Sequence, residues 1–276
     1  MNYLIADSGS TKTSWLLADS EGRRTEFETL GINPVRDSEE SMEETLQTLP
    51  LSSEIEKVFF YGAGCIPPYS DSLEQMLRRR FPQAETRVES DLLGAAHALC
   101  GDSEGIACIL GTGSNSGLYD GHTIVQNVSP LGYILGDEGS GAVLGKNLVG
   151  DLLKGQMSPH LLQAFYDETG LTRAQIINKV YREPQPNRFL ASLVPFLGRH
   201  REEAEIHQFL VDQLRRFFHR NVALYQRPDL AVHFVGGVAH SYSEELLEAA
   251  RLEGFRVGTI LQRPIAAMAD YLMGKR

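Results

Sequence analysis

The turn Asp7-Ser8-Gly9-Ser10-Thr11-Lys12-Thr13 is the first segment of the sequence whose residue types could do chemistry. Small residues in a tight turn can expose several backbone N–H groups together as a nest for an anion, and Lys12 adds a positive charge. Asp7 follows an apolar run, at a strand end where a carboxylate could hold hydrated Mg²⁺. The turn therefore predicts a phosphate and magnesium site, with an ordinary hairpin turn as the alternative. Three hydroxyl groups would add further donors: Ser10, Thr11 and Thr13.

Two other glycine clusters follow apolar runs. The turn Gly111-Thr112-Gly113-Ser114-Asn115-Ser116 is built like the first but carries no charge, and alone it is a weak signal. Paired with the first turn, it could bind the same polyphosphate from the opposite side. The strand expected before Gly236-Gly237 ends in bare backbone, against which a flat adenine or a ribose could lie.

Carboxylates stand at two further places where chemistry is expected. Asp91 lies between an expected strand and an expected helix, so it could be the helix N-cap, a general base for an attacking hydroxyl, or both. Asp137 and Glu138 lie among glycines, where carboxylates could accept hydrogen bonds from sugar hydroxyls. Asn33 and Asn115 could add amide contacts.

Several better-known sites are excluded. Ser140 to Asn147 is a near miss to a P-loop, because it lacks the first glycine and the Ser/Thr that holds Mg²⁺. No Gly-x-Gly-x-x-Gly follows an expected strand, which disfavours a dinucleotide fold. The three cysteines, Cys65, Cys100 and Cys108, lack the spacing of a zinc or iron–sulfur site.

The charge balance limits the partners. With 26 Lys+Arg against 36 Asp+Glu, the formal net charge is −10, which argues against nucleic acid or an anionic membrane as a bulk partner. No stretch approaches the roughly 18–20 apolar residues of a membrane span. The first residues also lack the basic region of a signal peptide, so we expect a cytoplasmic protein.

The elements expected around these residues form a pattern that occurs twice. Three short strands with a glycine turn after the first open the chain, and a second three-strand meander begins near residue 105, which indicates a structural duplication. The expected strands cover 3–6, 13–18, 24–29, 57–61, 86–89, 105–110, 116–119, 122–125, 230–235 and 255–257. The expected helices start at Ser38 (the cap), Asp71 and Asp91, and later cover about 201–225, 243–252 and 264–273.

Taken in order, the motifs resemble the actin/Hsp70/sugar-kinase ATPase superfamily, and more closely the BadF/BadG/BcrA/BcrD-type group that contains N-acetylglucosamine kinase. The resemblance covers nearly the whole chain. It implies an α/β, two-lobed actin-like ATPase (ribonuclease H-like) fold, with duplicated mixed-sheet domains and a cleft between them. The implied lobes are 1–104 plus a returning C-terminal helix at about 262–276, and 105–261. A homodimer is also implied.

The resemblance also implies roles for single residues. Asp91 matches the catalytic base. Gly9 to Thr13 and Gly111, Thr112 and Gly113 match the phosphate turns, while Gly236 and Gly237 match the adenosine motif. The positions that match hexosamine contacts are Asn33, Asn115, Gly132 and Asp137. Leu131-Gly132-Tyr133 replaces the Trp-Gly-His of the mammalian proteins, which leaves N-acetylglucosamine and glucosamine both open as substrates.

The sequence thus predicts an ATP- and Mg²⁺-dependent kinase for the 6-hydroxyl of an amino sugar, most simply N-acetylglucosamine. Two alternatives stay open. One is a dehydratase-activator ATPase, which would need cysteine ligands for a cluster. The other is a non-catalytic sugar sensor on the same fold, since a fold does not fix a function.

Overall fold

The computed structural model describes residues 1–9, 11–50 and 55–274, so Ser10 of the first turn lies outside the described residues. The chain forms two compact units. Unit 1 contains the described residues of Met1–Ala107, Tyr119–Val125 and Arg263–Arg276, and unit 2 contains Cys108–Leu118 and Gln126–Gln262. Among the described residues, no helix is long and apolar enough to cross a membrane.

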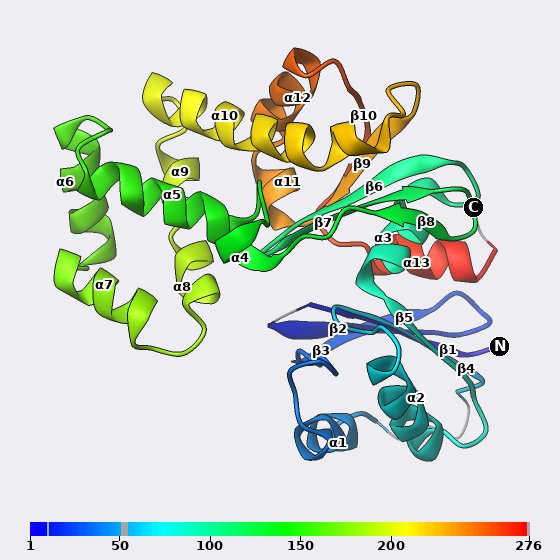
Figure 1. Ribbon diagram of the computed structural model, residues 1–276. Coiled ribbons are helices and arrows are strands. Elements are labelled where there is room, and N and C mark those ends of the chain that lie inside the picture. Colours follow the sequence, from blue (N-terminus) through cyan, green and yellow to red (C-terminus); the bar gives the residue numbers. More distant parts are fainter. Residues whose placement is uncertain (10, 51–54, 275–276) are drawn as a thin grey trace. The chain divides into compact units, whose positions relative to one another are not determined.

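The sheet of unit 1 has the strand order β3-β2-β1-β4-β5 (Figure 1). The first three strands form the expected antiparallel meander, whereas β1, β4 and β5 run parallel to one another. Their register places Ser8, Gly62 and Ser90 side by side where these three strands end. The strands are β1 (Tyr3–Ser8), β2 (Lys12–Ala18), β3 (Arg24–Leu30), β4 (Lys57–Gly62) and β5 (Glu85–Ser90).

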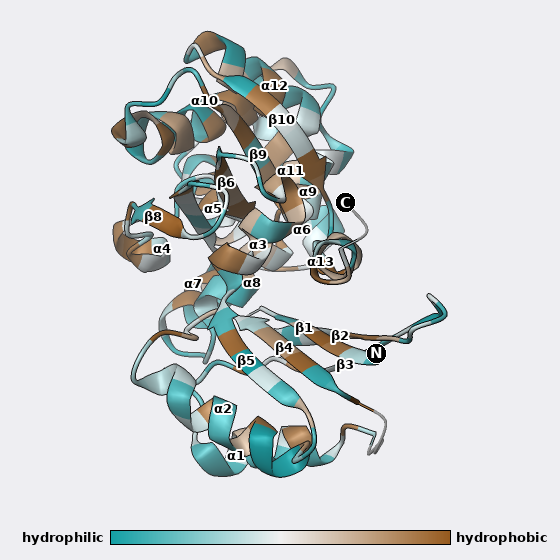
Figure 2. Ribbon diagram, turned by 90° about the vertical axis from the view of Figure 1, so that its right-hand side faces the viewer, coloured by the Kyte–Doolittle hydropathy of each residue, from teal (hydrophilic) through white to brown (hydrophobic). Residues whose placement is uncertain are grey.

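Helices cover both faces of this sheet, with α1 (Glu39–Gln47) and α2 (Tyr69–Arg80) on one face and α3 (Asp91–Cys100) and α13 (Ile265–Leu272) on the other (Figures 1 and 2). Ser38 caps α1 as expected, since its Oγ accepts the N–H of Ser41 at 3.2 Å. Helix α2 begins at Tyr69, two residues before Asp71, so the expected start at Asp71 is wrong.

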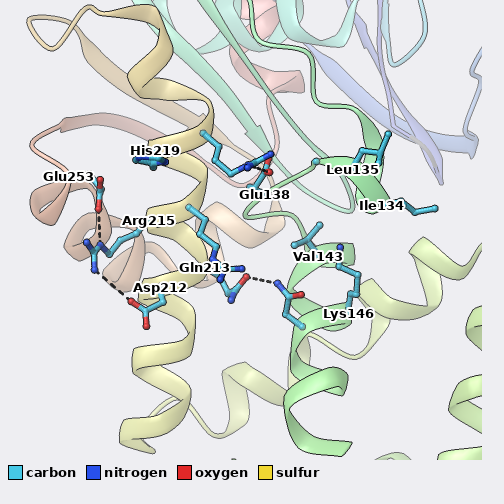
Figure 3. Close-up of a pocket in the computed structure, with 14 residues that line it drawn as sticks. Ile134, Leu135, Glu138, Val143, Lys146, Asp212, Gln213, Arg215, His219 and Glu253 are labelled. Carbon is cyan, nitrogen blue, oxygen red and sulfur yellow. Dashed lines mark hydrogen bonds and ion pairs between the residues drawn. The ribbon is translucent and has the colours of Figure 1, made fainter. Parts of the chain in front are cut away.

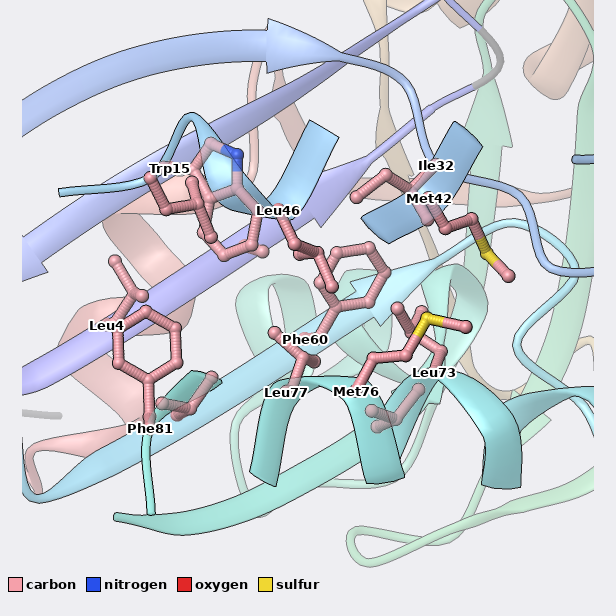
Figure 4. Close-up of a cluster of buried hydrophobic side chains, with 14 of the residues drawn as sticks. Leu4, Trp15, Ile32, Met42, Leu46, Phe60, Leu73, Met76, Leu77 and Phe81 are labelled. Atoms are coloured by element: carbon pink, nitrogen blue, oxygen red, sulfur yellow. The ribbon is translucent and has the colours of Figure 1, made fainter. Parts of the chain in front are cut away.

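The core of unit 1 lies between the sheet and the pair α1 and α2, where alternate strand residues meet the apolar faces of both helices (Figure 4). Trp15 is fully buried at its centre; it stacks on Phe27 and meets Phe60 edge to face. Its Nε1 donates to Thr29 Oγ1 at 2.9 Å, so the indole N–H is satisfied inside the core. This packing fixes β1 and β2, the two strands joined by the first glycine turn.

The second sheet has the order β10-β9-β6-β7-β8, so its meander repeats the arrangement of the first. The third strand of this meander begins two residues later than expected. The long helix expected at about 201–225 ends at Arg220, before a 3₁₀ turn (η1). Strand β10 is longer than expected because it pairs in parallel with β9 across an irregularity. The strands are β6 (Gly105–Leu110), β7 (Ser114–Tyr119), β8 (Ile124–Asn127), β9 (Ala231–Val235) and β10 (Arg256–Leu261).

The helices of unit 2 fill the remainder of the chain from residue 132 to residue 252 (Figure 1). They are α4 (Gly132–Leu135), α5 (Gly141–Leu153), α6 (Pro159–Thr169), α7 (Arg173–Tyr181), α8 (Pro186–Ser192), α9 (Pro195–Arg199), α10 (Ala204–Arg220), η1 (Val222–Tyr225), α11 (Gly237–Ser241) and α12 (Ser243–Leu252). Two mixed α/β sheets with a repeated meander confirm the predicted fold class.

Candidate functional site

The first glycine turn, between β1 and β2, is closed by its own backbone. The N–H of Gly9 donates to the carbonyl of Lys12 at 3.0 Å, and the N–H of Gly31 donates to the carbonyl of Thr11 at 3.1 Å. A side chain at Gly31 would come within 2.6 Å of the Gly9 carbonyl oxygen, so only glycine lets this loop pack on the turn. The segment that carries Asn33 therefore packs against the turn and holds it in place.

Hydroxyl groups hold the base of the turn. Ser8 Oγ and Thr13 Oγ1 lie 2.7 Å apart and are buried. Ser8 Oγ also accepts the N–H of Ile32 at 3.0 Å, and Thr13 Oγ1 donates to the carbonyl of Leu30 at 3.1 Å. Thr13 thus braces the turn from inside the fold, whereas Thr11 is exposed.

Two cations flank the turn and share one carboxylate. Lys12 Nζ lies 2.5 Å from Glu28 Oε1, and Arg263 Nη2 lies 3.8 Å from the same oxygen and 3.1 Å from Glu26 Oε2. Arg263 also donates to Ser14 Oγ at 3.2 Å, and Ser14 is the cross-strand partner of Asp7. Arg263 thus brings the start of the C-terminal helix segment to the Asp7 strand.

Asp7 lies near the end of β1 and Asp91 directly after β5, with β4 between these two strands. Burial raises the pKa of Asp7 to about 7, with a further contribution from the negative charge of Asp91, while Arg263 and Lys12 act in the opposite direction. Burial also raises the pKa of Asp91 to about 6, against a lowering effect of the Leu92 N–H, which donates to Asp91 Oδ1 at 2.9 Å. Two desolvated carboxylates at one sheet edge are suited to a cation and to proton transfer.

The structure resolves the choice of capping residue at α3. Ser90 is the N-cap, because its Oγ accepts the N–H of Leu93 at 3.2 Å, and Asp91 is the first helical residue. The alternative that Asp91 itself serves as the N-cap is therefore wrong. The Asp91 carboxylate keeps acceptor capacity beyond its bond to the Leu92 N–H.

Asn33 is buried in the loop after β3. Its Oδ1 accepts the N–H of Val35 at 3.1 Å, and its own N–H donates to Asp37 Oδ2 at 2.7 Å. A side chain at Gly64 would collide with the Asn33 amide, so Gly64 leaves room for it. The side-chain oxygen of Asn33 is thus turned to the backbone.

The second glycine turn, between β6 and β7, is joined to the start of α5. The N–H groups of Gly141 and Ala142 donate to the carbonyls of Gly111 at 2.8 Å and Thr112 at 3.0 Å. The Gly111 N–H donates to the Gly113 carbonyl at 2.9 Å. In the part of the chain that the structure describes, the N–H groups of Thr112 and Gly113 have no hydrogen-bond partner, so the turn can offer them to an anion.

Gly236 packs on this second turn. Its φ is +127°, and a side chain there would collide with the carbonyl of Leu110, directly before Gly111. A side chain at the neighbouring Gly237 would meet no atom within 4 Å. Gly236 is therefore closed by the second turn, whereas Gly237 leaves open space where a side chain would stand.

The two adjacent carboxylates of the Gly136–Ser140 loop have different surroundings. A side chain at Gly113 would come within 3.2 Å of Asp137 Oδ2, and burial raises the pKa of Asp137 to about 6, against a backbone hydrogen bond from Ser114. Glu138 instead pairs with Arg220 of α10 and accepts a 3.4 Å bond from Asn221 Nδ2. Asp137 thus lies against the second glycine turn, whereas Glu138 joins its loop to α10.

A pocket of about 740 Å³ lies on the Glu138 side of this loop, between α5 and α10 (Figure 3). Glu138, Lys146 and Gln213 are among its lining residues. Lys146 Nζ donates to the carbonyl of Tyr133 at 2.7 Å, which anchors α4 to α5. The lysine of the near-miss P-loop therefore has a structural contact.

Asn115 follows the second turn on β7, and its Oδ1 accepts two hydrogen bonds. One comes from the Ser116 N–H at 2.9 Å, and the other from Asn127 Nδ2, also at 2.9 Å. Gly132 begins α4 with φ +74° and has open space where a side chain would stand. Sequence reasoning missed Asn127 and Arg263, because neither lies in a glycine-rich motif.

Clustered metal ligands are absent from the described residues: no group of three or more His, Cys, Asp or Glu side chains could hold a metal ion. Cys65 and Cys108 are buried, and Cys100 is half-buried. Asp7 and Asp91 offer two carboxylates, which fits an ion such as Mg²⁺ that takes its other ligands from phosphate and water.

Comparisons with known proteins agree with this arrangement. No protein-family model matches the sequence, and no curated protein matches it. A solved structure of MamK bound to AMPPNP, 12% identical, covers 100% of this chain and 99% of its own with a TM-score of 0.52. Together with the two mixed sheets, this likeness places the chain in the actin-like ATPase fold.

Two solved structures are more similar. The protein described as a putative N-acetylglucosamine kinase from Porphyromonas gingivalis is 48% identical, with 99% of each chain covered and a TM-score of 0.95. A protein of the same description from Chromobacterium violaceum is 21% identical, with 99% of this chain and 98% of its own covered and a TM-score of 0.76. The chain belongs to the BadF/BcrA-type, N-acetylglucosamine kinase-like family.

Proposed function

We propose that this protein transfers the γ-phosphoryl group of ATP to an amino sugar, namely to the 6-hydroxyl of N-acetylglucosamine. The observation that carries the proposal is the pair of desolvated carboxylates, Asp7 and Asp91, beside a glycine turn with two flanking cations. The family membership supports it, because the 48% identical relative is described as a putative N-acetylglucosamine kinase.

Asp91 would act as the general base. Its carboxylate takes the proton of the 6-hydroxyl while the sugar oxygen forms a bond to the γ-phosphorus, and the bond from that phosphorus to the bridging oxygen of ADP breaks. A pKa of about 6 keeps Asp91 mostly ionised near neutral pH and still basic enough to accept a proton.

Asp7 would hold Mg²⁺, which neutralises phosphate charge when it is bound. The Gly9–Thr13 turn with Lys12, and the backbone N–H groups of the Gly111–Gly113 turn, would bind phosphates. The Gly236-Gly237 segment, with open space at Gly237, would contact the adenosine. We propose the functional lobes as 1–104 plus 262–276, and 105–261.

We propose four residues as contacts of the sugar. Asn33 and Asn115 each turn the side-chain oxygen to a backbone N–H, which leaves the amide NH₂ group for a ligand. Asp137 supplies a carboxylate and Gly132 an open stretch of backbone. A mixed set of donors and acceptors suits the hydroxyls and the acetamido group of a hexosamine.

We also propose a homodimer. Exposed apolar side chains gather in unit 2 around a pocket of about 570 Å³ between α5 and α7, and they include Ile134, Ile177 and Tyr181. Large exposed apolar patches commonly mark protein–protein contacts. Light scattering on the purified chain tests this, and a single-chain mass at micromolar concentration would contradict it.

A panel assay tests the proposed activity. ATP consumption and sugar phosphate formation are measured with N-acetylglucosamine, glucosamine, N-acetylmannosamine and glucose. We expect ADP and sugar phosphate to form in equal amounts, and N-acetylglucosamine to be the preferred substrate. Tight sugar binding without turnover would favour the sugar sensor. Iron in the anaerobically purified protein would favour the dehydratase activator, although no metal-ligand cluster occurs among the described residues.

A further inference from the structure

The side-chain amide of Asn115 has a fixed orientation. Its Oδ1 accepts the N–H of Ser116 at 2.9 Å and one hydrogen of Asn127 Nδ2 at 2.9 Å. A backbone N–H can only donate, so the atom that faces it must be the amide oxygen. Two donors at one oxygen occupy both of its lone pairs, and the Nδ2 of Asn115 has no partner among the described residues.

Asn127, the last residue of β8, is oriented by the same backbone. Its Nδ2 donates to the carbonyl of Ser116 at 2.6 Å, with a longer contact of 3.3 Å to the carbonyl of Val128. A carbonyl oxygen can only accept, so the NH₂ group of Asn127 must face β7. Ser116 therefore sets both amides, one through its N–H and the other through its C=O.

Buried Tyr225 fixes the ends of both strands. Its hydroxyl lies 2.7 Å from Ser116 Oγ and accepts the N–H of Val128 at 3.1 Å. The residues on either side of the two asparagines are thus tied to one phenol. This support keeps Asn127 within reach of Asn115 without using either asparagine side chain.

We propose that Asn127 is a positioning residue that locks Asn115 with its NH₂ group toward the sugar. Asn115 is then a donor only, and the sugar atom that it meets must be an acceptor. This inference rests on the proposed function, because it assumes that Asn115 contacts the sugar.

The fixed orientation of the Asn115 amide distinguishes between two amino sugars. The carbonyl oxygen of an acetamido group can accept from the Asn115 NH₂, while the acetamido N–H can donate to a carboxylate such as Asp137. The ammonium group of glucosamine has only donors, so it cannot pair with the Asn115 NH₂. The same side chain that supports N-acetylglucosamine therefore discriminates against glucosamine, and Asn127 maintains this polarity.

The test uses Asn127→Asp, which keeps the shape but cannot donate, and Asn127→Leu, which removes the polar group. We expect the KM for N-acetylglucosamine to rise about tenfold in both variants. The kcat and the KM for ATP should stay within about twofold of wild type, and the melting temperature within about two degrees. Asn178→Leu is the control, since Asn178 is a hydrogen-bonded, exposed asparagine on α7; it should change nothing.

A third variant reverses the polarity itself. Asn115→Asp places an acceptor where the NH₂ stood, so the ratio of kcat/KM for N-acetylglucosamine to that for glucosamine should fall at least tenfold. An unchanged KM for the sugar in both Asn127 variants, or an unchanged ratio in Asn115→Asp, would overturn the inference. If wild type phosphorylates no sugar at all, the proposed function fails instead.

Discussion

Burial raises the pKa of Asp7 at the end of β1, and the negative charge of Asp91, at the start of α3, raises that pKa further. Both residues stand where parallel strands end, because Ser8 of β1 and Ser90 of β5 are each in register with Gly62 of β4. Burial of two like charges at one edge is unfavourable for the isolated protein. A bound cation and an arriving proton would relieve it, so the arrangement favours the proposed chemistry over stability.

Replacement of the proposed base should remove most of the activity. In the Asp91→Asn variant we expect kcat to fall at least ~100-fold, because no group takes the proton of the attacking hydroxyl. Dissociation constants for ATP and sugar, measured by calorimetry, should change little. Activity equal to wild type would eliminate Asp91 as the base.

Activity should decline on acidification. Asp91 must be ionised to accept a proton and Asp7 to hold a cation, and their pKa values are raised to about 6 and about 7. Plots of kcat/KM against pH should therefore drop as pH falls below 7, with Mg²⁺ moving the drop to lower pH. A profile flat between pH 5 and pH 8 would disagree.

The same carboxylates predict the pH dependence of stability in the absence of ligands. Because the folded-state pKa of Asp91 is raised, the folded protein binds this proton more tightly than the unfolded chain. Stability should thus fall as pH rises from about 4 to about 6. At pH 7 the Asp91→Asn variant should therefore have a higher free energy of unfolding than wild type, by up to about 3 kcal/mol for a shift of about two pKa units. Its denaturant midpoint should be higher accordingly. Equal midpoints at pH 7 would refute the expectation.

Arg263 should support Asp7. Arg263→Gln removes a charge that lowers the pKa of Asp7 and a donor to Ser14. We expect a higher Mg²⁺ concentration for half-maximal activity, and an acid drop that moves to higher pH. Arg23→Gln is the matched control, because Arg23 pairs with Asp19 at an exposed turn of the same unit; identical behaviour of the two variants would count against Arg263.

The Gly236-Gly237 pair allows folding and nucleotide binding to be separated. Gly236→Ala should destabilise the protein by about 1–3 kcal/mol, because φ is +127° and the methyl group meets the Leu110 carbonyl. Gly237→Ala meets no protein atom within 4 Å, so it should fold normally and raise the KM for ATP. A normal KM in Gly237→Ala would move the adenosine elsewhere.

Glycine turns and strand periodicity were enough to predict both meanders. The packing of Gly236 on the Gly111 turn and of Asp137 beside Gly113 appears only in the structure, because it depends on how distant segments of the chain fold together. The sequence could not decide which residue is the N-cap of α3, because Ser90 and Asp91 are both good N-cap residues. Only the backbone geometry distinguishes between them.

Residues that act from outside the motifs could not be predicted. Arg263 stands far along the chain from Ser14 and reaches it only because α13 packs on the sheet of unit 1. The contact of Asn127 with Asn115 depends on the position of β8 beside β7. Strand β8 begins later than the sequence pattern suggested. Glu138 is equivalent to Asp137 in the sequence, and its pairing with Arg220 required the position of α10.

The most direct measurement is the structure of the reaction product. N-acetylglucosamine is incubated with MgATP and the protein, and the product is examined by phosphorus and proton NMR. We predict one phosphomonoester whose phosphorus couples to the two protons on carbon 6, with one ADP formed for each sugar phosphate. Phosphate on another hydroxyl, or inorganic phosphate without any sugar phosphate, would contradict it.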